Sequence, residues 1–508
     1  MKKLLSLFIA AILLASIAAG CGGSAKAPDE IIGAGGTDGP IIITALIVEQ
    51  YGAPITGDAM TLAAVKEATG VGFDITQVAP ADYAQKAQTT IASGNLPDFM
   101  STSSIDRTEY IYAGTFMKLD DLYEEYGQAI IAKYKEMNVE KNIQFIDGSY
   151  YTVASLSSRF FGINNTINNR WLKETGQDMP KSMEEFTNTL RIFKEAKGAD
   201  SIPFGCGLWA GAGGSITNMI KKTYAAFTAF YLYDEGYQFG AIERADRYKA
   251  AINWLANAYA EGLLDQNMFG TNDDEIMRQT AADKIGFFSS WADGFGLWGD
   301  GGSYGIDFIP APVFNTEFGK GYDSVANPVT GHYVLTKSNK NPEATMWALN
   351  YIYTDEGIEL MNWGIRDFTF TGFDDNRAYT DVILNHASGP VVGRYSLGMV
   401  YPQFPCYMDK EAEYVLNNPL TQEYEALIKA GNILPHQPNL TPTQAEQSEY
   451  STIMADVNRY INDQETAFIT GKVNFDAEYD VFISQLGKMG VRRAMEIRQD
   501  QYDRFIHR

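Results

Sequence analysis

Cysteine and histidine are scarce in this sequence, which has three cysteines and four histidines among its 508 residues. The histidines are scattered and show none of the spacings that gather ligands on zinc, so we expect no metal site and no cofactor. One cysteine lies near the N-terminus. The other two, Cys206 and Cys406, either pair as a disulfide or stay as buried thiols, and their spacing favours neither state.

Positive charge is also in short supply. The sequence has 40 Lys and Arg residues and 63 Asp and Glu residues, which gives a net charge of -23 at pH 7. A surface this acidic repels the phosphate backbone of DNA or RNA. The composition therefore excludes nucleic acid as a partner.

Motifs for phosphate and calcium are missing too. The glycine-rich stretches at 33–36 and 211–214 lack both the lysine of a phosphate loop and the dinucleotide fingerprint. The acidic clusters at 272–275 and 374–376 lack the alternating ligands and terminal Glu of an EF-hand loop. We interpret both clusters as solvated turns.

Long apolar runs are absent everywhere except at the N-terminus. There, two lysines precede an apolar run at 4–19, which ends in Gly20 and Cys21. This order is typical of a secretory signal, and the run falls short of the about 20 residues that a membrane span needs. The Gly-Cys pair resembles a bacterial lipobox. We therefore expect a lipoprotein signal peptide at 1–20 and lipidation of Cys21.

The next segment, 21–40, is rich in glycine and small residues and holds little that could build a core. Such a composition predicts a flexible tether. With Cys21 lipidated, this tether would hold the folded body at the extracellular face of the cell membrane.

Strands and helices alternate through the body. Apolar runs at 41–48, 71–78 and 96–100 read as buried strands, and periodic segments at 61–69 and 82–91 read as the helices between them. This order predicts an α/β fold with parallel pairing.

The rest of the chain continues the pattern. Apolar spacing predicts helices near 182–193, 248–263 and 342–362, and short strands at 284–288, 305–309 and 332–335. The length is too great for one ordinary domain and suits two.

Several segments, taken in order, are similar to the sugar-binding members of the extracellular solute-binding protein family 1, whose long Gram-positive members serve ABC importers. They are ASGNLPD at 92–98, LDDL at 119–122, DGSYY at 147–151, NRWL at 169–172, NPEA at 341–344 and the tail 468–505. Each motif alone is weak, because helix caps and turns recur everywhere. Their shared order over most of the chain carries the resemblance.

The resemblance implies a two-lobed, periplasmic-binding-protein-like (type II) fold similar to maltose-binding protein, with ligand held between lobes that close by hinge motion. It implies three interlobe crossings, near 154–160, 307–312 and 364–371. The expected lobe 1 comprises 41–155 plus 308–365, and lobe 2 comprises 156–307 plus 366–508.

A sugar site needs aromatic platforms for the C–H faces and polar groups for the hydroxyls. Trp291 follows the strand at 284–288 and resembles the strand-end "GPW" tryptophan of maltose-binding relatives, with Ser289 and Ser290 in place of Gly-Pro. It is our first candidate for stacking on a sugar, although a Trp is more often core. Asp293, just after it, would accept hydroxyls or else occupy a surface turn.

Polar residues also follow the first and third strands. Ser101 and Thr102 stand at the carboxyl end of the strand at 96–100, and Glu49 follows the strand at 41–48. Open α/β sheets bind ligands at such ends. The competing interpretation of the two hydroxyl side chains is a helix cap.

Three further candidates come from loops and crossings. Trp209 lies in a glycine-rich loop, where it would act as lid or platform or pack inward. Trp363 and Arg366 stand near the third expected crossing. Arg366 would contact hydroxyls or a carboxylate, or form an ordinary salt bridge.

The resemblance thus implies a binding protein without enzymatic activity, which we expect to be a monomeric, lipid-anchored component that delivers a carbohydrate to ABC permease subunits. An extra segment near 379–438 favours an oligosaccharide over a monosaccharide. Two alternatives stay open. One is a secreted glycoside hydrolase, which needs two carboxylates across a cleft; the other is a sensing protein of the same fold for a non-sugar solute.

Overall fold

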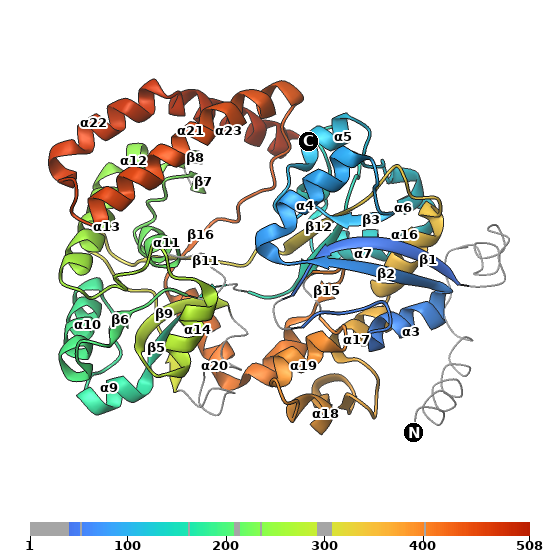
Figure 1. Cartoon of the computed structure of the whole chain (residues 1–508), viewed down its shortest axis with the longest axis horizontal. Coiled ribbons are helices and arrows are strands. Elements are labelled where there is room, and N and C mark those ends of the chain that lie inside the picture. The colour runs from blue at the N-terminus through green and yellow to red at the C-terminus, as the bar shows by residue number, and fades with distance from the viewer. Residues whose placement is uncertain are drawn as a thin grey trace.

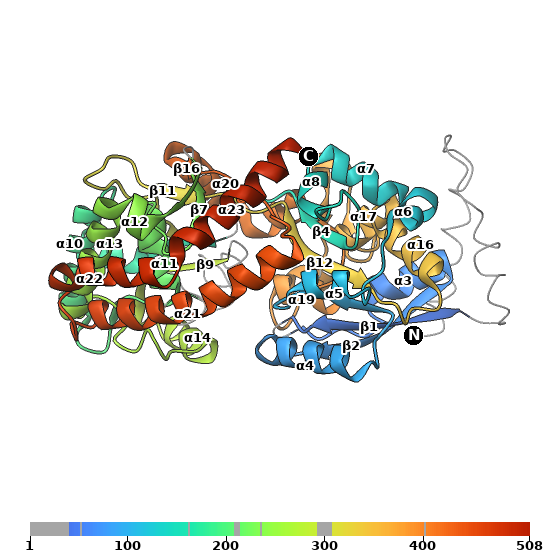
Figure 2. The ribbon, with the colours of Figure 1, turned by 90° about the horizontal axis from the view of Figure 1, so that it is seen from above.

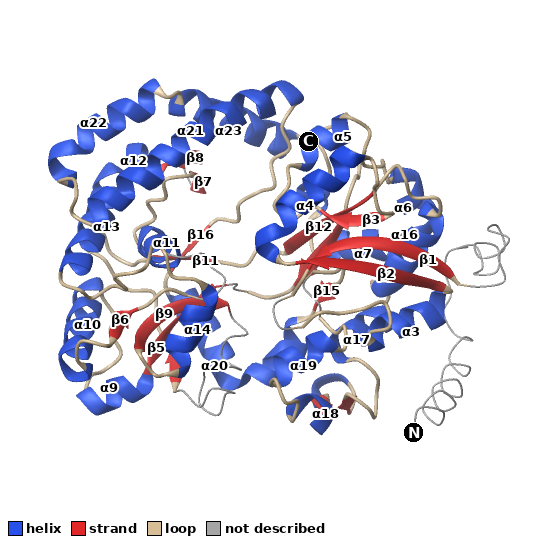
Figure 3. Ribbon diagram, viewed as in Figure 1, coloured by secondary structure: helices blue, strands red, loops and turns tan. Residues whose placement is uncertain are grey.

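The computed structural model describes residues 40–50, 53–160, 163–207, 214–233, 236–291, 307–400 and 403–508. Two α/β bodies lie side by side, each with its own sheet and its own hydrophobic core (Figure 1). Figure 3 shows the strands gathered in these two bodies with helices around them. Within these residues, no helix combines the length and apolar character needed to cross a bilayer.

Lobe 1 is built on a six-stranded sheet of order β15-β4-β12-β3-β1-β2. Its strands are β1 (Ile41–Val48), β2 (Val71–Val78), β3 (Phe99–Ser101), β4 (Val153–Ser157), β12 (Val329–Leu335) and β15 (Tyr407–Met408). The β1–β2, β1–β3 and β4–β15 pairs are parallel, whereas β12 runs antiparallel to β3 and β4. The expected parallel unit at the start of the chain is therefore confirmed.

Helices surround this sheet. They are α3 (Met60–Thr69), α4 (Pro80–Ser93), α5 (Arg107–Tyr112), α6 (Asp120–Tyr126), α7 (Gln128–Glu136), α8 (Glu140–Ile143), α16 (Pro342–Ile352), α17 (Asp355–Trp363), α18 (Asp381–Leu384) and α19 (Pro390–Ser396), with the 3-10 turn η3 (Asp374–Asn376) and the hairpin β13 (Phe370–Thr371) and β14 (Ala378–Tyr379). The single helix expected over 342–362 is two, because α16 ends at Ile352 with Tyr353 as its C-cap, and Thr354 then caps α17 by accepting the Gly357 N–H.

Lobe 2 is built on a four-stranded sheet of order β10-β5-β9-β6. Its strands are β5 (Ile163–Asn168), β6 (Ile202–Phe204), β9 (Ile285–Trp291) and β10 (Phe308–Pro310). The helices around it are α9 (Asn169–Thr175), α10 (Met183–Lys197), α11 (Gly214–Thr223), α12 (Gly240–Glu243), α13 (Ala245–Ala260), α14 (Asp273–Ala281) and α20 (Lys410–Ala430). Two further pairs complete it: β7 (Phe230–Tyr233) with β8 (Gly236–Phe239), and β11 (Tyr322–Ser324) with β16 (Asn432–Leu434).

Three C-terminal helices, α21 (Gln444–Ile469), α22 (Phe475–Lys488) and α23 (Val491–His507), pack on lobe 2. Figure 2 shows α21 and α23 extending from lobe 2 to lobe 1. The start of α21 lies beside α5, where Tyr112 donates to the Pro442 carbonyl at 3.3 Å. The far end of α23 reaches α8 through Arg508. The two lobes are thus joined by this helix pair as well as by the crossings.

The expected lobe boundaries are wrong at two places. Residues 308–314 pack in the core of lobe 2, so the second crossing lies between β11 and β12. Residues 366–408 pack in the core of lobe 1, where β15 forms the edge strand beside β4, so the third crossing follows β15. The reason lies in tertiary packing, because buried side chains such as Phe370, Tyr379 and Phe404 complete a core that begins with β1, and no local sequence pattern indicates this.

The two cysteines left open by the sequence are buried in different cores. Cys406 lies in the core of lobe 1 and Cys206 in the core of lobe 2. Burial raises the pKa of the Cys406 thiol to about 12. The two cysteines are therefore buried thiols and do not form a disulfide with each other.

Candidate functional site

The expected polar edge of lobe 1 exists. β1, β3 and β4 all run in the same direction, so their carboxyl ends meet the amino end of β12 at one edge of the sheet. Ser101, Thr102 and Glu49 lie there, the first two buried and the third half-buried. The Glu49 N–H donates to the Val78 carbonyl at 2.8 Å. The fold therefore brings these three candidates together.

The hydroxyls of Ser101 and Thr102 at this edge form hydrogen bonds with other groups of the protein. Thr102 donates its N–H and its hydroxyl to the His332 carbonyl, at 2.9 and 3.0 Å. The Ser101 hydroxyl accepts the Ser103 N–H at 3.1 Å. Asp106, and not either hydroxyl, is the N-cap of α5, because its carboxylate accepts the Thr108 N–H at 2.9 Å. Ser101 and Thr102 thus shape the edge and bring His332 close.

His332 stands at the centre of the edge. Its Nε2 lies 3.3 Å from the amide nitrogen of Asn439 and its Nδ1 lies 3.1 Å from the Thr152 hydroxyl. Because the amide nitrogen is a donor, Nε2 accepts and Nδ1 carries the proton. Burial, reinforced by the charge of Arg107, holds the pKa of His332 well below its usual range. The imidazole is therefore neutral at physiological pH.

A pocket of about 310 Å³ opens beside this histidine. Its walls come from three distant parts of the chain: the start of α5, the crossing into β12, and the segment between β16 and α21. The lining residues are Arg107, Asn327, Val329, Thr330, Gly331, His332, Gln437, Pro438 and Asn439. We call it the junction pocket, because the segments that form it pass between the two lobes.

Most polar groups of the junction pocket are held in place by the protein. Asn439 donates to the Asn142 carbonyl at 2.8 Å, and Gln437 donates to the Leu232 carbonyl at 3.1 Å while accepting the Leu232 N–H at 2.7 Å. The Asn327 side chain accepts the Val329 N–H at 2.9 Å. The pocket is thus a pre-organised set of amides with one hydroxyl, one neutral imidazole and one guanidinium.

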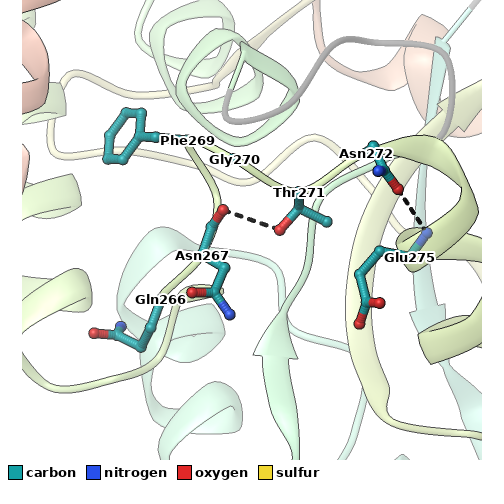
Figure 4. A pocket seen from close by; sticks show the side chains of 7 residues that line it. All are labelled: Gln266, Asn267, Phe269, Gly270, Thr271, Asn272 and Glu275. Carbon is teal, nitrogen blue, oxygen red and sulfur yellow. Dashed lines mark hydrogen bonds between the residues drawn. The ribbon is translucent and has the colours of Figure 1, made fainter.

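A second pocket, of about 540 Å³, lies in lobe 2 (Figure 4). It is formed by the loop before α14 and the first turn of that helix, with lining residues Gln266, Asn267, Phe269, Gly270, Thr271, Asn272 and Glu275. Asp265 organises this loop by accepting the Asn267 N–H at 2.9 Å and the Thr271 hydroxyl at 3.1 Å. Phe269 is 40% exposed as a residue, and it lies beside amide and carboxylate side chains.

This loop stands at the carboxyl edge of the sheet of lobe 2. Residues 263–265 run parallel to β6, since the Phe204 N–H donates to the Leu263 carbonyl and the Asp265 N–H to the Phe204 carbonyl, both at 2.9 Å. β6 in turn is parallel to β9, which ends at Trp291. The loop and the backbone of Trp291 therefore share one edge. Asp293 and Trp209 lie outside the described residues.

Trp363 and Arg366 lie away from both pockets. Trp363 is 3% exposed in the core of lobe 1, where its ring stacks on Tyr379 at 5.0 Å between centroids. Arg366 donates to a Glu359 carboxylate oxygen at 2.9 Å, and its guanidinium lies 3.9 Å from the ring centroid of Phe373. Of the two interpretations offered for Arg366, the structure has the salt bridge.

The sequence analysis missed the residues that line the junction pocket. Two signals could have located some of them: Arg107 opens a helix just after the strand that ends at Ser101, and His332 begins an expected strand. No local signal marks Asn327, Gln437 or Asn439. Across the described ranges, no three His, Cys, Asp or Glu side chains gather in a way that could hold a metal ion.

Comparison with known proteins gives one family and a consistent set of relatives. A family model described as bacterial extracellular solute-binding protein matches residues 50–359. The fructooligosaccharide ABC transporter substrate-binding protein FusA of Streptococcus pneumoniae is 24% identical over 491 residues, which cover 88% of this chain and 87% of that protein.

Solved structures match over nearly the whole chain. The alginate-binding protein AlgQ2 has a TM-score of 0.76 at 20% identity, with 92% of this chain and 99% of the other covered. An HMO-binding, ABC-transporter associated solute-binding protein from Bifidobacterium longum infantis has a TM-score of 0.74 at 17% identity with the same coverage. These matches confirm the expected two-lobed α/β fold.

Proposed function

The chain belongs to the bacterial extracellular solute-binding protein family, and we propose that it is the lipid-anchored component that captures an oligosaccharide for an ABC importer. The observation that carries this proposal is the junction pocket, whose amides, hydroxyl and neutral imidazole suit a ring of sugar hydroxyls. The relatives named above, which are described as binding fructooligosaccharide, alginate or HMO, support the same class of ligand.

The pocket in lobe 2 offers an aromatic side chain, which the lining of the junction pocket lacks among the described residues. Phe269, an exposed residue, offers this side chain, and Asn267, Asn272 and Glu275 offer groups that bind hydroxyls. Aromatic faces stack on the C–H faces of sugars. We infer that an oligosaccharide contacts both pockets, with successive sugar units divided between the lobes.

The expected ligand residues fall into three groups under this proposal. Ser101, Thr102 and Glu49 would act from the edge of lobe 1, and Trp291 would act from the edge of lobe 2. Asp293 and Trp209 remain candidates from the sequence. We leave Trp363 and Arg366 out, because packing and a salt bridge already occupy them.

The ligand class is tested by thermal shift on a soluble variant that begins at Gly22, screened against neutral and acidic oligosaccharides, monosaccharides and oligopeptides. A ligand at about a hundred times its dissociation constant adds about 2.7 kcal/mol of stability, a readily measured shift. A shift with an oligosaccharide that survives overnight incubation uncleaved supports the proposal. Shifts with peptides alone would contradict the ligand class, and cleavage would point to a hydrolase.

The anchor and the importer need separate tests in cells. Replacing Cys21 with Ala removes the sulfur that would carry the lipid, so the protein should move from the membrane fraction to the medium. Uptake of the labelled oligosaccharide should fall in the same cells, while the purified variant binds as before. Membrane retention of the Cys21→Ala protein would contradict the lipid anchor.

A further inference from the structure

Among the described residues that line the junction pocket, Arg107 alone is charged. Among the described residues, its guanidinium takes part in no hydrogen bond or ion pair. Asp106 is the neighbouring acid, but its carboxylate is engaged elsewhere: one oxygen caps α5 and the other accepts from the Gln447 amide. The cation therefore faces the pocket without a carboxylate of its own.

The surroundings of Arg107 compensate its charge only in part, through the neighbouring Asp106. The lining within the described part of the chain contains no Asp or Glu, and His332 is held neutral beside Arg107. Burial lowers the pKa of Arg107 to about 10, opposed only in part by Asp106, so the side chain stays protonated at neutral pH. The pocket thus carries one positive charge in a protein whose net charge is -23.

A buried cation is costly unless a counter-charge or several hydrogen bonds compensate it. Two buried cations of lobe 2 follow that rule: Lys221 pairs with Glu465 and Lys222 with Asp323, all four side chains being buried. Arg107 differs from these two lysines, because it is half-buried and faces an open pocket instead of a protein acid. The missing counter-charge points to the ligand.

We propose that the junction pocket binds a carboxylate of the ligand, so that the solute is an acidic oligosaccharide containing a uronic acid or another carboxylated sugar. This rests on the proposed function. The planar guanidinium fork matches the two oxygens of a carboxylate, which it binds through paired hydrogen bonds. The Thr330 hydroxyl and the amides of Asn327 and Asn439 lie around it, where the ring hydroxyls of the same sugar would fall.

The test compares one ligand in two charge states. Isothermal titration is run with oligogalacturonides and with the same oligomers fully methyl-esterified, which keeps their size and hydroxyls but removes their charge. We expect the acid to bind about 10 to 100 times more tightly than the ester, as for a hydrogen bond to a charged partner. Arg107→Gln should abolish that difference, and Arg107→Lys, which keeps the charge but loses the fork, should retain part of it.

Lys118→Gln is the matched control, because it removes one positive charge from an exposed side chain of lobe 1. It should preserve the preference for the acid. The unliganded melting temperature of each variant checks its fold, and the comparison of acid with ester needs no variant at all.

The failure of this inference differs from the failure of the proposed function. If neutral oligosaccharides bind, and acid and ester bind equally or the acid not at all, the carboxylate proposal is overturned and the oligosaccharide proposal stands. Preference for a sulfated oligosaccharide over a carboxylated one would also overturn it. If no oligosaccharide of any charge binds, the proposed function itself fails.

Discussion

At the scale of single residues, His332 couples the stability of the protein to pH. Its imidazole is neutral and hydrogen-bonded on both nitrogens, between Thr152 of lobe 1 and Asn439 of the segment that leads to α21. Protonation would add a donor where Nε2 now accepts and would place a second cation beside Arg107. The His332 side chain thus links Thr152 and Asn439, which are 287 residues apart in sequence, through hydrogen bonds.

The lowered pKa of His332 fixes the sign of the pH effect. In the unfolded chain the imidazole titrates near about 6.5. Below that pH, His332 is protonated in the unfolded state but stays neutral in the folded state. The free energy of unfolding therefore decreases as pH falls. We expect the wild type to lose up to about 1.4 kcal/mol per pH unit more than His332→Gln below this point.

Chemical denaturation of both proteins between pH 5 and 8 measures that difference. The pKa of His436 is also lowered by burial, but His436 is present in both proteins and cancels in the comparison. Equal pH profiles for the two proteins would contradict the role of His332.

At the scale of elements, α21 is held by its cap and by a buried ion pair. Thr443 and Glu446 form a reciprocal capping box, in which each side chain accepts a backbone N–H of the other residue. Further along, Glu465 accepts from Lys221 of α11 at 2.9 Å and from the Tyr248 hydroxyl of α13 at 3.1 Å. The helix is therefore tied to lobe 2 at one end and capped beside lobe 1 at the other.

The cap is tested by Thr443→Ala, which leaves the Glu446 N–H without its partner. We expect a loss of about 1 kcal/mol, seen as a lower melting temperature. Thr443→Ser keeps the hydroxyl and serves as the control. A melting temperature that falls equally in both variants would mean that the methyl group, and not the cap, matters.

The ion pair is tested by Lys221→Met alone and together with Glu465→Leu. The single change leaves a buried carboxylate without its cation and should cost about 3–5 kcal/mol. The double change removes both charges and should recover much of that loss, although Tyr248 and Thr228 then lose an acceptor. The denaturation midpoints of the wild type and the two variants measure these changes in stability. Equal losses of stability in the single and double variants would contradict a stabilising role of the ion pair.

At the scale of the whole molecule, the end of α23 fastens lobe 2 to lobe 1. Arg508 donates to the carbonyls of Lys141, Gln144 and Phe145 around the end of α8. Lys141 in return donates to the Ile506 carbonyl at 3.4 Å. A cation at a helix C-terminus is favourable because the last carbonyls of the helix have no partner of their own.

Arg508→Ala should therefore loosen this contact while leaving both cores intact. We expect faster hydrogen exchange in α8 and in the last turn of α23, with little change in the strands of either sheet. Arg493→Ala, on the same helix, breaks an exposed pair with Glu449 and should leave exchange at α8 unchanged. Unaltered exchange at α8 in the Arg508 variant would contradict the fastening role.

Much of the local structure could be predicted from the sequence because its causes are local. The mostly apolar segment at 41–48 is β1, with its end at the predicted residue. Gly70 and Gly94 end α3 and α4 in the left-handed conformation, with φ of 73° and 75°. Ser101, Thr102 and Glu49 could be placed at one edge because parallel strands bring their carboxyl ends together.

The lobe boundaries and the junction pocket were decided only by tertiary structure. Segment 366–408 belongs to lobe 1 because its apolar side chains complete a distant core, and Trp363 is buried there by the same packing. Arg107, His332 and Asn439 meet across more than 300 residues of sequence, since the crossings carry their segments to one place. Periodicity and caps report on neighbours a few residues apart, whereas a pocket between lobes depends on how whole elements pack.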